Sequence, residues 1–234
     1  MEPSGIKLVL LPGMYGSTEL FADFEKALPR EFVTERVGYP NDVSLSYAEL
    51  LEFVRSCVPV SESHVIVAES FSTPLAIQFA GTNPPNMKGL VLSAGFATSP
   101  VRGLLRFMTP FLAPFLSHLP VNEFGATLMT HGSTVPEIQQ TQLRTAIASV
   151  GPKVLMDRVR AVVACNALDD LGSVNVPVLY LQARYDRLVN PACLAEMRQV
   201  KPEIEVAVLD SSHMLLQQVP SEASQIVADF VRRL

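Results

Sequence analysis

One stretch of the sequence decides the fold, and it reads His64-Val65-Ile66-Val67-Ala68-Glu69-Ser70-Phe71-Ser72-Thr73-Pro74-Leu75-Ala76. The pattern predicts a buried strand, a sharp turn and a helix. Ser70 lies at the turn, where a side chain stands above the edge of a sheet. The small residues Ala68 and Ser72 flank it, as is required where strand and helix backbones nearly touch. Ser70 is therefore a candidate nucleophile, although a serine after a buried strand also serves as a helix N-cap.

On either side of this stretch, short apolar runs alternate with helical patterns, which is typical of parallel βαβ units. Helices are indicated by the apolar spacing over 20–28, by a capping box from Ser46 to Glu49, and by the segment 221–231. Six apolar runs are expected to be strands: Ile6–Leu11, Phe32–Val37, Val65–Ala68, Gly89–Ser93, Val176–Gln182 and Ile204–Leu209. The sequence thus predicts an α/β fold with a mostly parallel central sheet of about six strands and helices on both faces.

The alternation stops between residues 99 and 170, where no strand pattern is present. The segment Val101–Leu119 is rich in Leu, Phe and Met but contains Pro110 and Pro114, which predicts short broken helices. We expect a helical cap over 99–170, inserted between strands of a core formed by 1–98 and 171–234. The alternative is a set of extra core helices.

Composition excludes several classes of function. The 234 residues carry a net charge of −5, which argues against a nucleic-acid partner. Cys57, Cys165 and Cys193 are an odd number without a close-spaced pair, so neither a disulfide framework nor a metal site is predicted. The first apolar run is too short to span a bilayer, and the N-terminus lacks the features of a secretory signal. We expect a cytoplasmic protein with no stable membrane association.

Three further segments follow expected strands, and each contains residues that suit a catalytic site. They are Leu11-Pro12-Gly13-Met14-Tyr15-Gly16-Ser17, Ala183-Arg184-Tyr185-Asp186-Arg187-Leu188-Val189 and Asp210-Ser211-Ser212-His213-Met214. Together with Ala68-Glu69-Ser70-Phe71-Ser72, they resemble the H-G-x-x-G, G-x-x-D-x-x-V, G-x-x-H and G-x-S-x-G motifs of the α/β-hydrolase superfamily. This chain departs from the family pattern by replacing the first motif's histidine with Pro12 and the elbow's glycines with Ala68 and Ser72.

The resemblance implies an α/β-hydrolase fold with Ser70 as nucleophile, His213 as base and Asp186 as the acid that orients the base. It also implies an oxyanion hole formed by the backbone N–H groups of Met14 and Phe71. Candidate substrate contacts are Tyr15, Phe107, Phe111 and Met214. Other residues of suitable chemistry are expected to have structural roles: Asp169, Asp170, Asp210, His64, His118 and His131. A cysteine nucleophile is an alternative, although none of the cysteines lies in a strand-to-helix turn.

The predicted function is hydrolysis of a small-molecule carboxylic ester through an acyl-enzyme on Ser70, without a metal or organic cofactor. The same fold also supports acyltransferases, lyases, cofactor-free oxygenases and non-catalytic ligand receptors.

The overall plan is similar to that of pimeloyl-acyl-carrier-protein methyl ester esterases, whose cap is basic. Residues 101–168 carry six basic and three acidic side chains, a balance of +3 against −5 for the whole chain. This balance predicts an anionic substrate or an acidic acyl carrier protein, with Arg144, Arg158 and Arg160 exposed; an ordinary solvated face is the alternative.

Overall fold

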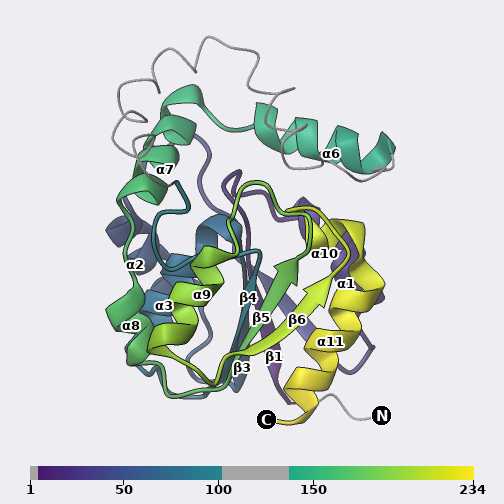
Figure 1. Cartoon of the computed structure of the whole chain (residues 1–234). Coiled ribbons are helices and arrows are strands. Elements are labelled where there is room, and N and C mark those ends of the chain that lie inside the picture. Colours follow the sequence, from purple (N-terminus) through teal and green to yellow (C-terminus); the bar gives the residue numbers. More distant parts are fainter. Residues whose placement is uncertain (1–4, 102–136) are drawn as a thin grey trace.

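The expected strands all form and pair in one six-stranded parallel sheet of order β2-β1-β3-β4-β5-β6 (Figure 1). The structure is a computed structural model that describes residues 5–101 and 137–234. The strands are β1 (Lys7–Leu11), β2 (Val33–Arg36), β3 (His64–Glu69), β4 (Met87–Ser93), β5 (Val178–Ala183) and β6 (Glu205–Leu209). Because all five pairings are parallel, the carboxyl ends of the strands lie at one edge of the sheet.

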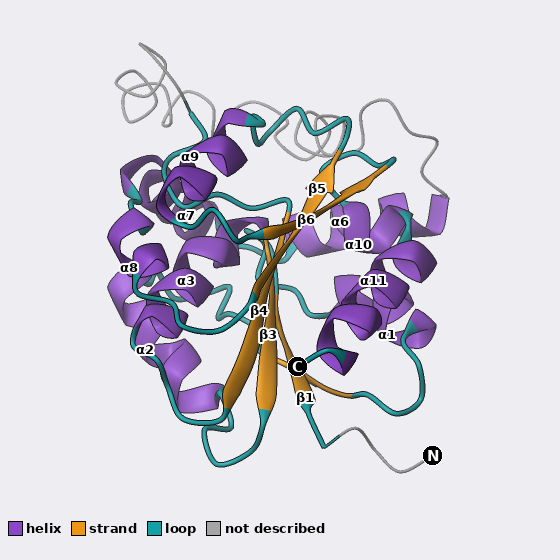
Figure 2. Cartoon of the chain, turned by 60° about the horizontal axis from the view of Figure 1, so that its bottom comes forward, coloured by secondary structure: helices purple, strands orange, loops and turns teal. Residues whose placement is uncertain are grey.

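Helices cover both faces of the sheet (Figure 2). One face carries α2 (Tyr47–Cys57), α3 (Thr73–Gly81), α8 (Leu168–Gly172) and α9 (Ala192–Val200). The other carries α1 (Ala22–Ala27), α10 (Leu215–Gln218) and α11 (Pro220–Arg232). Strand side chains alternate between these layers, so Val9 and Leu11 pack in one core while Leu8 and Leu10 pack in the other. This double burial explains why the strands read as continuous apolar runs.

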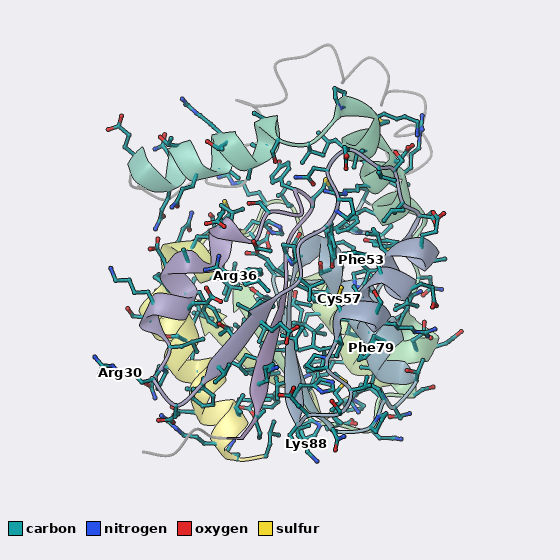
Figure 3. All side chains as sticks on the ribbon, turned by 180° about the vertical axis from the view of Figure 1, so that it is seen from behind. Arg30, Arg36, Phe53, Cys57, Phe79 and Lys88 are labelled. Carbon is teal, nitrogen blue, oxygen red and sulfur yellow. The ribbon has the colours of Figure 1, made fainter. Side chains whose placement is uncertain are left out.

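The predicted capping box is present at the start of α2, where the Ser46 hydroxyl accepts the N–H of Glu49 and the Glu49 carboxylate accepts the N–H of Ser46. The face of the sheet that α2 and α3 cover also carries the side chains of Phe53, Cys57 and Phe79 (Figure 3). Lys88, near the amino end of β4, marks the edge of the sheet farthest from α6 and α7 (Figure 3).

The chain between β4 and β5 includes α6 (Glu137–Ala148) and α7 (Pro152–Ala164), which lie above the carboxyl edge of the sheet (Figure 1). An isolated antiparallel bridge between Thr98 and Asn166 closes the base of this segment. Residues 102–136, including Pro110 and Pro114, lie outside the described residues. The domain limits 1–98, 99–170 and 171–234 therefore stay a prediction. Within the described ranges, no helix has the length and apolarity needed to span a membrane.

The described part of the insertion is held to the sheet by a small apolar cluster. Its members come from α6, from α7, from the turn between these helices and from the loops after β1 and β6: Tyr15, Leu143, Ala146, Ile147, Val150, Val154 and Met214. A polar contact adds to it, because Gln139 of α6 donates a 2.8 Å hydrogen bond to the Gln217 carbonyl of α10. These contacts place α6 and α7 beside the loops that carry the predicted site.

Candidate active site

Ser70 lies immediately after β3, in a backbone conformation that ordinary residues avoid. Its φ is +49°, in the left-handed region, where a side chain at Cβ meets its own backbone. A 3₁₀ turn (Ser70–Ser72) and α3 follow at once. The neighbouring Ala68 and Ser72 are fully buried, which fits the requirement for small residues. This strained turn presents Ser70 above the carboxyl edge of the sheet, half-buried.

The structure brings Ser70, His213 and Asp186 together in one hydrogen-bonded chain. The Nε2 atom of His213 lies 2.7 Å from the Ser70 Oγ, and its Nδ1 atom lies 2.8 Å from the Asp186 Oδ2. The three residues come from loops after β3, β5 and β6, which meet because parallel strands end at the same edge. The imidazole can therefore take the serine proton at Nε2 while Nδ1–H is held by the carboxylate.

The loop after β5 fixes the Asp186 carboxylate. Its Oδ1 atom accepts the backbone N–H groups of Leu188 and Val189, at 2.8 and 2.9 Å. Val189 is buried in the core, which explains the valine of the G-x-x-D-x-x-V pattern as an anchor. Because Oδ1 is occupied by backbone donors, Oδ2 remains for His213.

The loop carrying His213 is fixed by Gln218 of α10. The Gln218 Oε1 accepts the hydroxyl of Ser211 at 2.8 Å and the N–H of Ser212 at 3.0 Å. In addition, the Tyr185 N–H donates to the Ser211 carbonyl at 3.0 Å, which joins the loops of the acid and the base. The role of Gln218 was not predicted, because no sequence motif identifies a glutamine five residues after a histidine as a residue that holds a loop.

The environment of His213 suits a general base. Burial lowers the pKa of His213, but the hydrogen bond and charge of Asp186, together with the charge of Glu69, outweigh burial and raise it above the ordinary value of 6.5. The carboxylates thus stabilise the imidazolium that forms when the base takes a proton.

Glu69 is a buried carboxyl directly beneath this site. It occupies the position before Ser70 and is 6% exposed. Burial raises the pKa of Glu69, partly opposed by the Gln217 side chain, the charge of His213 and the N–H of Gly13. The burial of Glu69 follows from its place as the last residue of β3.

The turn containing Met14 lies on the other side of Ser70. The Gly16 N–H donates to the Gly13 carbonyl at 3.0 Å, and the φ of Gly16 is +67°. A Cβ atom at Gly16 would lie 3.0 Å from the Tyr39 Cβ and 3.1 Å from the Arg158 Nη1, so glycine is needed for both space and conformation. The N–H of Phe71 lies in the first turn of helical backbone, where donors lack an intrahelical acceptor.

Ser72 links the turn that carries Ser70 to this loop. Its hydroxyl donates to the Pro12 carbonyl and accepts the Tyr39 hydroxyl at 2.5 Å. The Tyr47 hydroxyl donates to the Phe71 carbonyl at 3.0 Å, and its ring stacks on the Phe71 ring. The serine that replaces the second elbow glycine is therefore more than a small residue, because it connects two loops of the site.

Of the predicted substrate contacts, Tyr15 and Met214 lie in the cluster between α6, α7 and the body, and each is 7% exposed. Burial raises the pKa of Tyr15 to about 12, so its hydroxyl stays protonated at neutral pH. Phe107 and Phe111 lie outside the described residues.

The competing residues lie elsewhere. Asp210 is paired with Arg184 at the surface. His64 is buried at the amino end of β3, with its Nδ1 2.9 Å from the Glu62 carbonyl. Asp169 and Asp170 are in the first turn of α8, and His118 and His131 lie outside the described residues. Over 5–101 and 137–234, no group of His, Cys, Asp and Glu side chains is arranged to hold a metal.

One expectation about the insertion is wrong. Arg158 is not an exposed surface charge but is 2% exposed, because its guanidinium is inserted between α7 and the loops after β1 and β2. It donates to the Met14 carbonyl at 2.7 Å, the Pro40 carbonyl at 2.8 Å and the Asn41 Oδ1 at 3.3 Å. Arg160 is exposed as expected, but it pairs with Asp157, as does Lys153.

The sequence was also compared with known families. The sequence profile of the family described as "Serine aminopeptidase, S33" matches residues 35–214, which is most of the chain. The chain therefore belongs to the S33 family of α/β hydrolases. This match spans Ser70, Asp186 and His213 of the S33 hydrolase. A comparison with curated proteins gave no match.

Solved structures share the fold of this S33 hydrolase over nearly its full length. The enol-lactonase from Burkholderia xenovorans LB400 has a TM-score of 0.83 at 14% identity, covering 99% of this chain and 92% of that chain. The bromoperoxidase from Bacillus anthracis has a TM-score of 0.87 at 14% identity, covering 99% and 93%. A putative aryl esterase from Burkholderia cenocepacia has a TM-score of 0.79 at 20% identity, covering 99% and 92%. At these identities the likeness establishes the fold alone.

Proposed function

We propose that the protein is a serine hydrolase that cleaves a carboxylic ester through an acyl-enzyme on Ser70. The observation that carries the proposal is the continuous hydrogen-bond chain from Ser70 Oγ through His213 to Asp186. A serine hydroxyl is a weak nucleophile until a base takes its proton, and this chain supplies the base with a fixed orientation. The raised pKa of His213 supports the same role, since it favours proton uptake.

The reaction proceeds in two halves. Ser70 Oγ attacks the ester carbonyl carbon as His213 Nε2 takes its proton, and the oxyanion is held by the N–H groups of Met14 and Phe71. When the tetrahedral intermediate collapses, the C–O bond breaks and His213 returns the proton to the leaving alcohol. Water then attacks the acyl-enzyme with His213 again as base, and the acid is released while Ser70 regains its proton.

Two features favour turnover over a receptor that merely keeps the fold. Ser70 stays in the left-handed region although a glycine there would avoid the strain. In addition, the Asp186 side chain is 7% exposed and directs one oxygen to His213. Both arrangements cost stability or desolvation, and nucleophilic catalysis gives them a use.

The proposed substrate is an ester of a small acid or of an acyl chain. In the charged version of this proposal, the acyl group is anionic or is linked to an acidic carrier. This charged version rests on Lys153 and Arg160, which line a groove of about 720 Å³ beside α7 together with Asp157, Ser44 and Ser46. Because the lining of this groove does not include Ser70, His213 or Asp186, the two cations would act by steering the substrate. Arg158 is not part of that surface, because it is buried.

The test compares wild type with Ser70→Ala and Asp186→Asn. We expect wild type to be labelled by a fluorophosphonate and to hydrolyse p-nitrophenyl esters of graded chain length. Ser70→Ala should lose labelling and several orders of magnitude in kcat, and Asp186→Asn about 10⁴-fold. Because the family description names a peptidase, amino-acid p-nitroanilides belong in the same panel. A Ser70→Ala variant that retained more than about a hundredth of the wild-type kcat would overturn the proposal.

A further inference from the structure

Arg158 is a buried cation next to the proposed oxyanion hole. Within the described part of the chain, no carboxylate forms an ion pair with it; its polar partners there are two backbone carbonyls and an amide oxygen. Burial lowers the pKa of Arg158, yet a guanidinium stays charged at neutral pH. A buried charge without an opposite charge is costly, so its position calls for a specific role.

The hydrogen bonds of Arg158 fix one side of the oxyanion hole. The Gly13 carbonyl accepts the Gly16 N–H, and because a trans peptide is planar this fixes the opposite N–H, that of Met14. Arg158 Nη1 donates to the next carbonyl, that of Met14 itself, at 2.7 Å. Both peptide units that flank the Met14 Cα are thereby held, and Arg158 supplies one of the two contacts.

The same guanidinium contacts the other side of the hole. Its central carbon lies 6.0 Å from the centre of the Phe71 ring and 5.9 Å from the centre of the Tyr39 ring. Tyr39 in turn donates to Ser72, whose hydroxyl donates to Pro12 just before the Met14 turn. Arg158 thus contacts both residues expected to supply oxyanion donors, the Met14 carbonyl by a hydrogen bond and the Phe71 ring by its guanidinium.

We propose that Arg158 is a positioning residue by which α7 of the insertion sets the geometry of the oxyanion hole. This inference rests on the proposed function. The charge of Arg158, which no described carboxylate neutralises, acts in the same direction, because a cation in a water-poor site favours the negative charge that develops on the carbonyl oxygen. The insertion therefore does more than cover the site, since it completes the part that stabilises the transition state.

The test is steady-state hydrolysis of a neutral p-nitrophenyl ester by wild type, Arg158→Met and Arg158→Lys. We expect Arg158→Met to lower kcat by about 10- to 100-fold, less than the roughly 10²–10³ lost when an oxyanion donor is removed. The KM should change little, because the donors act in the transition state rather than on bound ester. Arg158→Lys keeps the charge and can reach a carbonyl, so it should recover part of kcat; it also serves if Arg158→Met does not fold.

Two controls separate positioning from stability. Arg55→Met removes an exposed arginine of α2 that pairs with Glu52, and it should leave kcat unchanged. A trifluoromethyl ketone, which forms an oxyanion adduct with a serine, should lose affinity for Arg158→Met by a similar factor, whereas the matching secondary alcohol should not.

The possible results distinguish this inference from the proposed function. If wild type is neither labelled nor active, the proposed function fails and the inference fails with it. If wild type is active and a folded Arg158→Met variant keeps the wild-type kcat, with or without a change in KM, the proposed function stands. Arg158 is then not a positioning residue.

Discussion

We expect Glu69 to couple the protonation of the site to the stability of the fold. Its carboxyl has a raised pKa because it is buried, and its charge helps to raise the pKa of His213. A raised carboxyl pKa means that the folded protein disfavours the anion. The stability associated with this group is therefore fully present below its unfolded pKa, ordinarily near 4.5, and is lost as pH rises through the folded pKa.

We predict that Glu69→Gln stabilises the protein at pH 8 and has less effect at pH 4, because glutamine cannot lose a proton. It should also move the acid limb of the kcat/KM profile to lower pH, since His213 loses one of the charges that favour its protonated form. Thermal unfolding and pH–rate profiles check both effects, with the exposed Glu222→Gln as control. An equal change in stability at the two pH values, with an unmoved profile, would contradict this coupling.

The roles of residues that lie in sequence motifs were predictable, whereas the roles of residues that depend on tertiary contacts were not. Each of Ser70, Asp186 and His213 follows the end of an apolar strand by only a few residues in sequence. Because the strands are parallel, these residues come together at one edge of the sheet. Arg158 has no such marker. It lies on a helix among other basic residues, and only the three-dimensional structure shows its guanidinium inserted into the body. The role of Ser72 was missed for the same reason, because its partners Tyr39 and Pro12 are far away in sequence. Gln218 is close in sequence to its partners Ser211 and Ser212, but no motif marks it.

At the scale of elements, the strands were the most predictable parts, because burial on both faces makes them continuous apolar runs. The capping box of α2 was also readable, since both of its bonds are local. The placement of α6 was not, because its described core contacts are with loops whose positions depend on the whole sheet.

The attachment of α6 to the rest of the protein can be tested at Leu143. This residue is 1% exposed and packs in the cluster with Tyr15 and Met214. We predict that Leu143→Ala lowers the free energy of opening of α6 by about 2 kcal/mol, the lower end for such truncations. Amide hydrogen exchange in α6 should then quicken by roughly 30-fold while α11 stays protected. The exposed Thr145→Ala on the same helix is the control. Unchanged exchange in α6 would mean that other contacts hold the helix.

At the scale of the whole molecule, charge on the described part of the insertion is smaller than its composition indicates. Arg158 is buried, and Lys153 and Arg160 share Asp157. These two exposed cations remain the described residues best placed to attract an anionic substrate to the groove beside α7.

We predict that Lys153→Gln/Arg160→Gln lowers kcat/KM several-fold for a carrier-linked or anionic ester, with kcat nearly unchanged, because surface charges mainly steer encounter. A neutral ester serves as the matched substrate and should be unaffected. The difference should shrink as the Debye length falls from about 30 Å at 0.01 M salt to about 8 Å at physiological strength. Equal losses for both substrates, or no salt dependence, would leave this face an ordinary solvated surface.

The strand order also sets a sequence of events in time. The first four strands to be synthesised, β1 to β4, are neighbours in the sheet, so the turn that carries Ser70 and the Met14 loop can form early on the ribosome. The outer edge of β4 must then wait for β5 while the intervening segment is made, on the order of ten seconds. During that interval the apolar edge formed by Leu90, Val91 and Leu92 is unpaired and open to aggregation or to a chaperone. The nascent chain thus carries Ser70 long before His213, so the proposed triad is incomplete until β6 and the loop after it emerge.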